Sequence, residues 1–321
     1  MLTNQSLQKR KLGNEGLEVS AIGLGTMTMP DNQNSISAIH GALDQGITLF
    51  DTADLYGNEG FQQQRFGDNE KLLGKALKGR RDEAIVATKF GATHSHGYKG
   101  DPAYIKKSVD ASLYSLGLNH IDLYYQHRYD PHTPIEETVS TLAELVKLGK
   151  IRYIGLSEAP VEIIRRAHAV HPITAVQTEY SLWSRDVEDE ILPFLKDMKI
   201  GLVPYSPLGR GFLTGNIQRA EDLSETYPHQ MYSRFQGDNF AKNVKAASLI
   251  KEIADQKGYT TAQLSLAWLL AQGDQIVPIP GSKRLERIQE NYGALKVILT
   301  KEDLAEIEHI VPKGSASGSR F

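Results

Sequence analysis

The chain has 321 residues, 40% of them hydrophobic and 23% charged, with a formal net charge of −3. This balance is ample for a packed core and excludes a nucleic-acid surface built on excess positive charge. The absence of cysteine excludes disulfides, thiolate metal sites and cysteine nucleophiles, and it fits a reducing compartment such as the cytoplasm. The sequence shows no signal-peptide core and no run of about 18 apolar residues, so we expect a soluble cytoplasmic protein without a membrane partner.

Short β-branched runs alternate along the chain with amphipathic stretches. Segment 10–20 has two short apolar runs around a turn and is predicted as a β-hairpin. Helical patterns follow, several of them beginning at Ser, Asp or Pro and ending at Gly, as capped helices do. Between these helices eight strands are predicted, at 21–27, 48–53, 84–90, 121–127, 151–158, 175–181, 201–207 and 276–281.

The interval before the eighth strand is much longer than the others. It contains an irregular polar loop from 208 to 240 and then two helical stretches, at 242–258 and 260–273. A loop of this length inside a compact domain is typical of an insertion over a site. A last helix is predicted at 301–311, followed by a tail from 313 to 321 whose Gly/Ser-rich composition is typical of mobile ends.

Eight strand–helix units in strict order predict an α/β fold, a single (β/α)8 TIM barrel over residues 1–321 with the hairpin closing its bottom. A doubly wound sheet would alternate in the same way. The polar residues favour the barrel, because they lie in the C-terminal parts of different strands, and those ends meet at one mouth only in a barrel. They are Asp51, Lys89, His127, Ser157, Glu158, Gln177, Ser206 and Ser282.

Four residues form a set suited to protonating a carbonyl oxygen. Tyr56 has a phenol with an ordinary pKa of about 10, so it needs a group that stabilises its phenolate. Lys89 on the third strand can supply this positive charge, and Asp51 on the second can keep the ammonium charged despite burial. His127, at the end of the fourth strand, can donate a hydrogen bond to a substrate oxygen.

The chain also resembles the aldo-keto reductase family, from about Lys11 to Val311. The resemblance lies in FDTADLYG, ATKF, the strand ending in QH, GLSEA, VQTEYSLWSR, VPYSPLGRGFLTG and IPGSKRLERIQEN, which occur in the family's order. It implies a barrel enzyme that binds NADPH across its mouth and transfers a hydride to an aldehyde or ketone. The Ser-Glu-Ala after strand five and the Gly-Ser-Lys-Arg after strand eight resemble the branch with short C-terminal tails.

The resemblance also implies roles for individual residues. Tyr56 becomes the general acid, Lys89 and Asp51 lower its pKa, His127 orients the carbonyl, and no metal is required. Tyr205 stacks on the nicotinamide. The other residues implied at the cofactor are Gly25, Thr26 and Asp51, then Ser157, Glu158 and Gln177 near the carboxamide, Ser206, Pro207, Leu208 and Gly211 around the pyrophosphate, Gly281, Ser282, Lys283 and Arg287 at the 2′-phosphate, and Glu290 and Asn291 at the adenine.

Two positions depart from the family pattern. Glu158 stands where many relatives have Asn, and an ionised carboxylate cannot donate to the carboxamide oxygen. Gly281 stands where many relatives place a lysine on the 2′-phosphate, so Lys283 or Arg284 must compensate. NADPH is therefore the expected cofactor, with NADH the less favoured one. The substrate pocket is expected among Met27, Phe90, Arg128 and Trp183, beside Tyr56 and His127.

Several alternatives stay open at this stage. Arg128 either meets a substrate carboxylate or pairs with an acid such as Asp130. Lys89 and Asp51 alone would fit a structural ion pair, and Lys89 alone would fit the nucleophile of a Schiff-base aldolase. The same barrel also serves as an NADPH-binding regulatory subunit with little turnover. A monomer and a homo-oligomer are equally compatible with the sequence.

Overall fold

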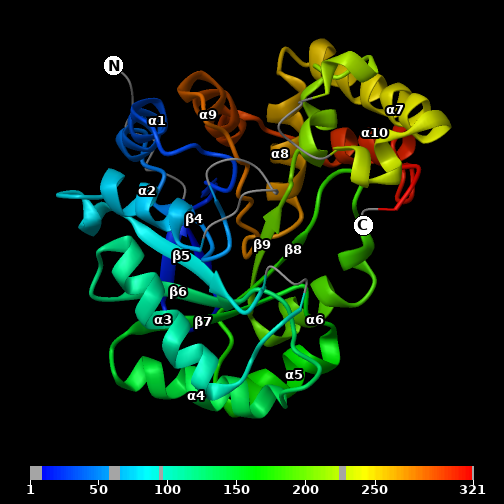
Figure 1. Ribbon diagram of the computed structural model, residues 1–321. Coiled ribbons are helices and arrows are strands. Elements are labelled where there is room, and N and C mark those ends of the chain that lie inside the picture. Colours follow the sequence, from blue (N-terminus) through cyan, green and yellow to red (C-terminus); the bar gives the residue numbers. More distant parts are fainter. Residues whose placement is uncertain (1–8, 58–65, 94–96, 224–228, 320–321) are drawn as a thin grey trace.

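The computed structural model describes residues 9–57, 66–93, 97–223 and 229–319 (Figure 1). Its main sheet is parallel, and the strands neighbour one another in the order of the sequence. The strands are β3 (Leu24–Gly25), β4 (Leu49–Asp51), β5 (Ile85–Phe90), β6 (Ile121–Gln126), β7 (Ile151–Ser157), β8 (Ala175–Glu179) and β9 (Gly201–Tyr205).

Segment 276–281 closes the barrel between β9 and β3. It pairs in parallel with β9 through Ile276 and Leu202, and with β3 through Gly281 and Gly25. The sequence predicted a regular eighth strand here, but the segment forms only isolated bridges. The reason is proline on both sides of the pairing, because Pro204 of β9 and the two prolines of the segment each lack the N–H that a ladder needs. The predicted (β/α)8 barrel is confirmed, and backbone hydrogen bonds such as Val277 N–H to the Leu202 carbonyl at 2.9 Å join its eighth stave.

Helices surround this barrel, and their ends follow the capping signals of the sequence. For example, the Asp101 side chain accepts a hydrogen bond from the Tyr104 N–H at the start of α3, which ends at Gly117 with φ 64°. The helices are α1 (Gln33–Asp44), α2 (Asp68–Ala76), α3 (Pro102–Leu116), α4 (Ile135–Lys147), α5 (Val161–Val170), α6 (Ile191–Met198), α7 (Gly237–Gln256), α8 (Thr261–Ala271), α9 (Leu285–Tyr292) and α10 (Lys301–Ile310).

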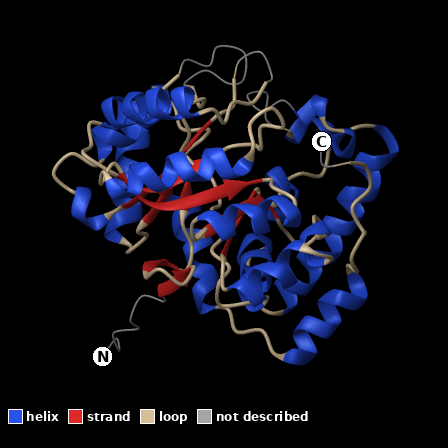
Figure 2. Ribbon diagram, turned by 90° about the horizontal axis from the view of Figure 1, so that it is seen from below, coloured by secondary structure: helices blue, strands red, loops and turns tan. Residues whose placement is uncertain are grey.

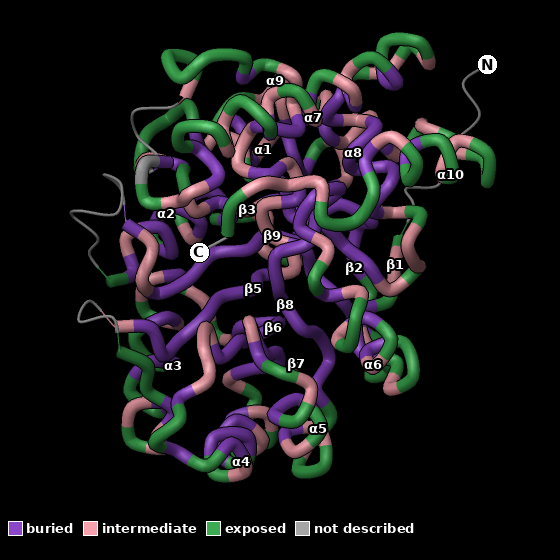
Figure 3. The backbone as a smooth tube through the Cα atoms, turned by 90° about the vertical axis from the view of Figure 1, so that its right-hand side faces the viewer, coloured by how far each residue is buried: buried purple, intermediate pink, exposed green. Residues whose placement is uncertain are grey.

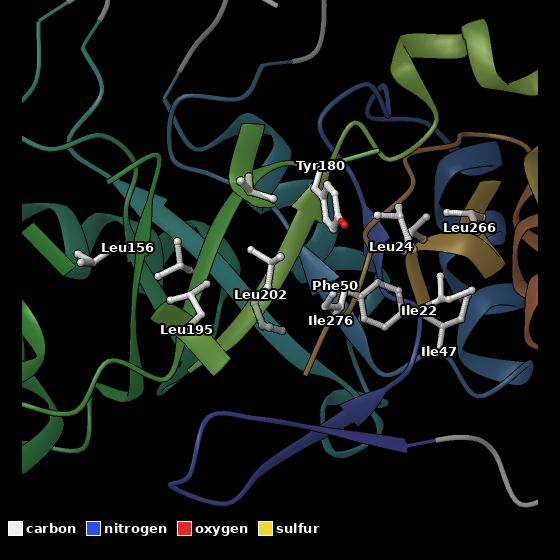
Figure 4. Packing of buried hydrophobic residues seen from close by; sticks show 14 of the residues in the cluster. Ile22, Leu24, Ile47, Phe50, Leu156, Tyr180, Leu195, Leu202, Leu266 and Ile276 are labelled. Atoms are coloured by element: carbon white, nitrogen blue, oxygen red, sulfur yellow. The ribbon is translucent and has the colours of Figure 1, made fainter. Parts of the chain in front are cut away.

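An antiparallel hairpin of β1 (Lys9–Leu12) and β2 (Leu17–Ser20) closes the bottom of the barrel. Its side chains Leu12, Leu17 and Val19 join the cluster that fills the barrel interior. Figure 4 shows the hairpin passing below the barrel strands, and Figure 2 shows it apart from the parallel wall. The predicted role of this hairpin as a plug is therefore confirmed.

Side chains alternate along each strand between two apolar clusters. The barrel interior holds the smaller cluster, which includes Leu123 and Val203. The larger cluster lies between the strands and the helices, and Figure 4 shows members such as Phe50 of β4 and Leu202 of β9. The strands are buried along most of their length, whereas the outer helix faces are exposed (Figure 3). None of the helices in the described ranges has the length and apolarity that a bilayer crossing requires.

The interval between β9 and the closing segment is more ordered than expected. Short 3₁₀ turns η3 (Gly209–Thr214), η4 (Ala220–Asp222), η5 (His229–Met231) and η6 (Ser233–Phe235) precede α7 and α8. The tail packs beside them instead of hanging free. Asn243 of α7 exchanges two hydrogen bonds with the Ser317 backbone, at 2.9 and 2.8 Å. The Ser319 N–H donates to Ser233 Oγ at 2.9 Å, so this part of the chain is bound as far as residue 319.

Candidate active site

Asp51 and Lys89 meet inside the barrel near its mouth. Lys89 Nζ donates to Asp51 Oδ1 at 2.5 Å and to the Thr52 carbonyl at 2.7 Å. Asp51 is 3% exposed and Lys89 0% exposed, so both charges are almost completely removed from water. β4 and β5 are hydrogen-bonded neighbours, which places the two side chains on one wall. A buried pair of this kind persists only when other groups complete its hydrogen bonding.

Tyr56 and His127 lie over this pair. Tyr56 follows β4 in a turn whose Tyr56 N–H donates to the Ala53 carbonyl at 3.2 Å. Lys89 Nζ lies 4.9 Å from the centre of the Tyr56 ring. The ring also meets His127 edge-on, at 5.7 Å between centroids and an angle of 83°. The four residues predicted as a catalytic set are thus brought together.

The electrostatics of Tyr56 differ from the expectation. Burial raises the pKa of Tyr56, and the Asp51 charge raises it further, while Lys89 lowers it. Because burial is the largest of these effects, the net shift of the Tyr56 pKa is upward. The expectation that Lys89 and Asp51 together lower this pKa is corrected: of these two residues, only Lys89 lowers it. The phenol therefore keeps its proton at neutral pH.

Within the same set, Lys89 is charged and His127 is neutral. Burial alone would lower the pKa of Lys89, but Asp51 and Tyr56 outweigh it and the net shift is upward, so the ammonium stays charged. Burial also lowers the pKa of His127 well below its ordinary value, and Lys89 and Arg128 lower it further. The imidazole is therefore neutral and has one ring N–H to donate.

Two groups that the sequence did not assign to this set fix its geometry. Gln177 Nε2 donates to Asp51 Oδ2 at 2.7 Å, although the resemblance implied a role at the carboxamide. Asn69 is completely buried, and its Oδ1 accepts from Thr26 Oγ1 and Thr52 Oγ1, both at 2.7 Å. The Asn69 N–H donates to the Tyr56 carbonyl at 3.1 Å. A polar residue at a helix position that should face the core was the available signal for Asn69.

The rim predicted to hold the cofactor contains strained backbone. Four non-glycine residues in the described ranges have positive φ, and three lie after β7 or β9: Glu158 at 53°, Ser206 at 47° and Arg210 at 54°. Such conformations cost about 1–3 kcal/mol each and cluster at ligand sites. Glu158 Oε1 accepts from Thr178 Oγ1 at 2.8 Å and from the Glu179 N–H at 3.0 Å, so this oxygen turns toward β8.

Glu179 at the end of β8, which sequence reasoning missed, anchors the loop after β9. Its carboxylate accepts from Arg210 Nη2 at 2.8 Å and from Arg210 Nη1 at 3.3 Å, with both side chains almost fully buried. Arg234 of η6 lies 3.6 Å from the same carboxylate and donates to Ser184 Oγ at 2.6 Å. Gly209 precedes Arg210 with φ 56° in close contact with the Trp183 indole, which leaves no space for a side chain.

The segment after the eighth stave offers cations to a phosphate. Ser282 Oγ accepts from the Arg284 N–H at 3.2 Å, while Lys283 and Arg284 are exposed. Arg287 and Glu290, expected at the 2′-phosphate and the adenine, form an ion pair at 2.5 Å. Asn291 is buried beside them. Gly25 and Gly281 pair where the barrel closes, and a Cβ on Gly25 would lie 3.0 Å from the Ile279 carbonyl oxygen.

The predicted substrate pocket is corrected at two positions. Phe90 is 0% exposed and stacks on Tyr124 at 4.9 Å, outside the barrel, because the neighbouring Lys89 takes the inward face. Trp183 is 3% exposed and packs edge-on against Phe212 at 4.9 Å, below the loop after β9. Two other expected pocket residues, Met27 and Arg128, are partly exposed.

The predicted cofactor residues fit an extended dinucleotide. Tyr205, at the end of β9, is partly exposed and packs on the barrel-interior cluster. Leu208 and Gly211 belong to the anchored loop beside it, with the Gly211 N–H donating to the Leu208 carbonyl at 3.0 Å. A stacking ring, a fixed glycine loop and a cationic segment therefore follow one another around the mouth, which suits a nicotinamide, a pyrophosphate and an adenosine phosphate.

Comparisons with known proteins agree with this geometry. The model of the Aldo/keto reductase family matches residues 21–312. The chain is 45% identical to probable aldo-keto reductase 1 from Glycine max over 333 aligned positions, which cover 100% of this chain and 93% of that protein. Among solved structures, the glycerol dehydrogenase of Gluconobacter oxydans has a TM-score of 0.85 at 29% identity, over 96% of this chain and 98% of that one.

A second solved relative contains a bound nicotinamide cofactor. It is an aldo/keto reductase from Klebsiella pneumoniae in complex with NADP and acetate, with a TM-score of 0.76 at 26% identity over 95% of this chain and 96% of that one. The family match extends over most of the chain, and the relatives are covered almost completely. This chain belongs to the aldo/keto reductase family.

Proposed function

We propose that the protein reduces aldehydes or ketones to alcohols with NADPH, using Tyr56 as the general acid. Membership of the aldo/keto reductase family makes the chain an oxidoreductase. The Klebsiella pneumoniae relatives were solved with NADP and with NADPH, which supports this cofactor. The single observation that carries the proposal is the contact of a protonated Tyr56 with both the charged Lys89 and the neutral His127.

The chemistry of the site follows from these protonation states. When bound, NADPH supplies the hydride that reduces the carbonyl carbon. The Tyr56 phenol donates its proton to the carbonyl oxygen, and the Lys89 charge stabilises the phenolate that remains. The neutral His127 donates its N–H to the same oxygen and fixes its position. Asp51 keeps Lys89 charged and in place.

The residues that would hold the cofactor are those around the rim. Tyr205 would stack on the nicotinamide, with Ser157 next to its carboxamide, and the loop from Ser206 to Gly211 would wrap the pyrophosphate. Lys283 and Arg287 would meet the 2′-phosphate. Charge-assisted hydrogen bonds of about 1.5–3 kcal/mol each would favour NADPH over NADH, although Arg287 must share its charge with Glu290.

A panel of aldehydes and ketones with NADPH or NADH tests the proposal in the native protein and in Tyr56→Phe. We expect the turnover number of the variant to fall about 10²- to 10⁴-fold. Its NADPH affinity, measured by fluorescence titration, should change little. Tyr114→Phe is the matched control, because Tyr114 is 86% exposed on α3. Reduction at the native rate by Tyr56→Phe would show that another group is the acid.

The same measurements separate the alternatives. A regulatory NADPH-binding protein would retain tight cofactor binding with negligible turnover of every carbonyl in the panel. A Schiff-base aldolase would be trapped on Lys89 by borohydride in the presence of a carbonyl compound. We expect no trapping, because the pKa of Lys89 is raised and a protonated amine is not a nucleophile.

A further inference from the structure

The charge of Arg128 is not neutralised by the protein. Arg128 follows His127 at the end of β6, and its side chain is partly exposed at the mouth. Its Nη1 donates to the His127 carbonyl at 2.8 Å and to Ser157 Oγ at 3.2 Å. Among the residues that the structure describes, no carboxylate forms an ion pair with this guanidinium.

Asp130, the acid that the sequence offered as a partner for Arg128, is used elsewhere. Its Oδ2 accepts from the Gly100 N–H at 2.9 Å and from Thr133 Oγ1 at 2.8 Å, and its Oδ1 accepts from the His132 N–H at 2.9 Å. Three donors therefore hold this carboxylate in the loop between β6 and α4. The alternative of a local Arg128–Asp130 pair is removed.

Other cationic groups near the barrel mouth have a buried carboxylate as partner. Lys89 pairs with Asp51, and Arg210 and Arg234 share the Glu179 carboxylate. Arg128 has no such carboxylate partner among the described residues, and it lies close enough to influence the reacting groups. Its field reaches them, because it lowers the pKa of both Tyr56 and His127.

One edge of the Arg128 guanidinium is also left over. Both of its hydrogen bonds come from Nη1, and neither Nε nor Nη2 donates to a described residue. At other places in this chain the Nε–Nη2 edge of an arginine binds both oxygens of a carboxylate. Arg166 uses it on Glu136 at 2.7 and 2.8 Å, and Arg185 uses it on Glu188 at 2.8 and 3.0 Å. Two parallel N–H donors match the two oxygens of a carboxylate.

We propose that Arg128 is a specificity-determining residue that binds a carboxylate on the substrate, so that the preferred substrates are aldehydes or ketones carrying an acidic group. This inference rests on the proposed carbonyl reduction, because it assumes that the substrate carbonyl lies at Tyr56 and His127. The side chain hydrogen-bonds to the His127 backbone, so it holds the carboxylate at a fixed place relative to the reacting oxygen.

Matched acid and ester substrates test the assignment. We compare 3- and 4-formylbenzoate with their methyl esters in the native protein, in Arg128→Gln and in Arg128→Lys, with Arg165→Gln on α5 as a surface control. In Arg128→Gln we expect kcat/KM to fall roughly 10- to 100-fold for the preferred acid and to change less than about threefold for its ester. Arg128→Lys should retain part of the preference, because it keeps the charge but loses the bidentate edge.

A binding measurement gives an independent readout. The alcohol products, 3- and 4-(hydroxymethyl)benzoate, are titrated calorimetrically into the protein saturated with NADP+. Carboxylate binding lost in Arg128→Gln, with cofactor affinity preserved, supports the assignment even if no aldehyde in the panel is reduced, an outcome that would overturn only the proposed function. If Arg128→Gln keeps the native acid-to-ester ratio and the native affinity for the products, the assignment is wrong. It is also wrong if this variant loses affinity for the cofactor while its preference for acids is unchanged.

Discussion

Gln177 Nε2 and Lys89 Nζ bind opposite oxygens of one carboxylate, that of Asp51, at 2.7 and 2.5 Å. The amide comes from β8 and the ammonium from β5, so Asp51 is held from two sides of the barrel interior. Both oxygens of this buried anion have charge-assisted or amide donors, which a buried ion pair requires. The Gln177 side chain is therefore tied to the catalytic set.

Replacing Gln177 by leucine tests which of these connections dominates. We expect kcat to fall about tenfold, because Asp51 loses a buried hydrogen bond and positions Lys89 less firmly. The NADPH dissociation constant should change less than about threefold. Steady-state kinetics and a fluorescence titration check this, with the exposed Gln256→Leu on α7 as control. A large loss of cofactor affinity at unchanged kcat would assign Gln177 to the carboxamide instead.

The protonation states of the site predict a flat pH profile. The Tyr56 pKa lies above its ordinary value, so the phenol that must donate a proton stays protonated until the pH exceeds about 10. The His127 pKa lies well below its ordinary value, so the ring stays neutral through about pH 6.5 and lower. For aldehyde reduction, kcat/KM should therefore change little between about pH 6.5 and 10. A titration near neutral pH that disappears in Tyr56→Phe would contradict this.

The pair of Glu179 and Arg210 predicts a link between stability and cofactor binding. Arg210→Met leaves the buried Glu179 with only Arg234 and Ser184, and we expect a loss of about 3 kcal/mol in the free energy of unfolding. The loop after β9 loses its anchor, so the NADPH dissociation constant should rise about tenfold, since an ordering cost of about 1.4 kcal/mol is added to binding.

Arg219→Met is the control on the same loop, because Arg219 is 75% exposed and lies 3.6 Å from its partner Asp222. An exposed pair of this kind contributes at most about 1 kcal/mol. Equal effects of the two substitutions on cofactor affinity would show that the buried pair does not organise the loop.

Arg10 binds the N-terminal hairpin to the rest of the barrel. Its guanidinium donates to the carbonyls of Leu270, Gly273 and Ile276 at 2.9, 2.7 and 2.6 Å, at the end of α8 and the start of the closing segment. Arg10→Ala should cost about 2–4 kcal/mol in urea unfolding, because three charged hydrogen bonds are lost. The neighbouring Lys9→Ala should cost less than about 1 kcal/mol, since the Lys9–Glu18 pair is exposed.

The sequence predicted most of the barrel wall, because buried parallel strands leave continuous apolar runs. The predicted strand at 84–90 became β5 at Ile85–Phe90, and that at 175–181 became β8 at Ala175–Glu179. The prediction of a regular strand at 276–281 was wrong, because prolines interrupt the ladder although the composition of the segment is typical of a strand. Phe90 was misplaced although alternation predicts it: with Lys89 inward, the next side chain must point outward.

Contacts between segments that are distant in the chain could not be predicted from the sequence. Nothing in the residues around Glu179 or Arg210 indicates that they pair, because this depends on how the loop after β9 folds back over β8. The direction of the Tyr56 pKa shift was likewise hidden. Burial decides it, and the sequence gives no measure of how much water the surrounding loops exclude.

The fastening of the plug also bears on how the chain is made. Arg10 and its carbonyl partners are separated by 260 to 266 positions. During synthesis the N-terminal hairpin emerges first and must wait for nearly the whole polypeptide before these partners exist. Until then Leu12, Leu17 and Val19 have no completed cylinder to enter. A ribosome-bound fragment that stops before α8 should therefore expose this hairpin to chaperones and proteases. The hairpin becomes buried only when the last strands of the barrel have been made.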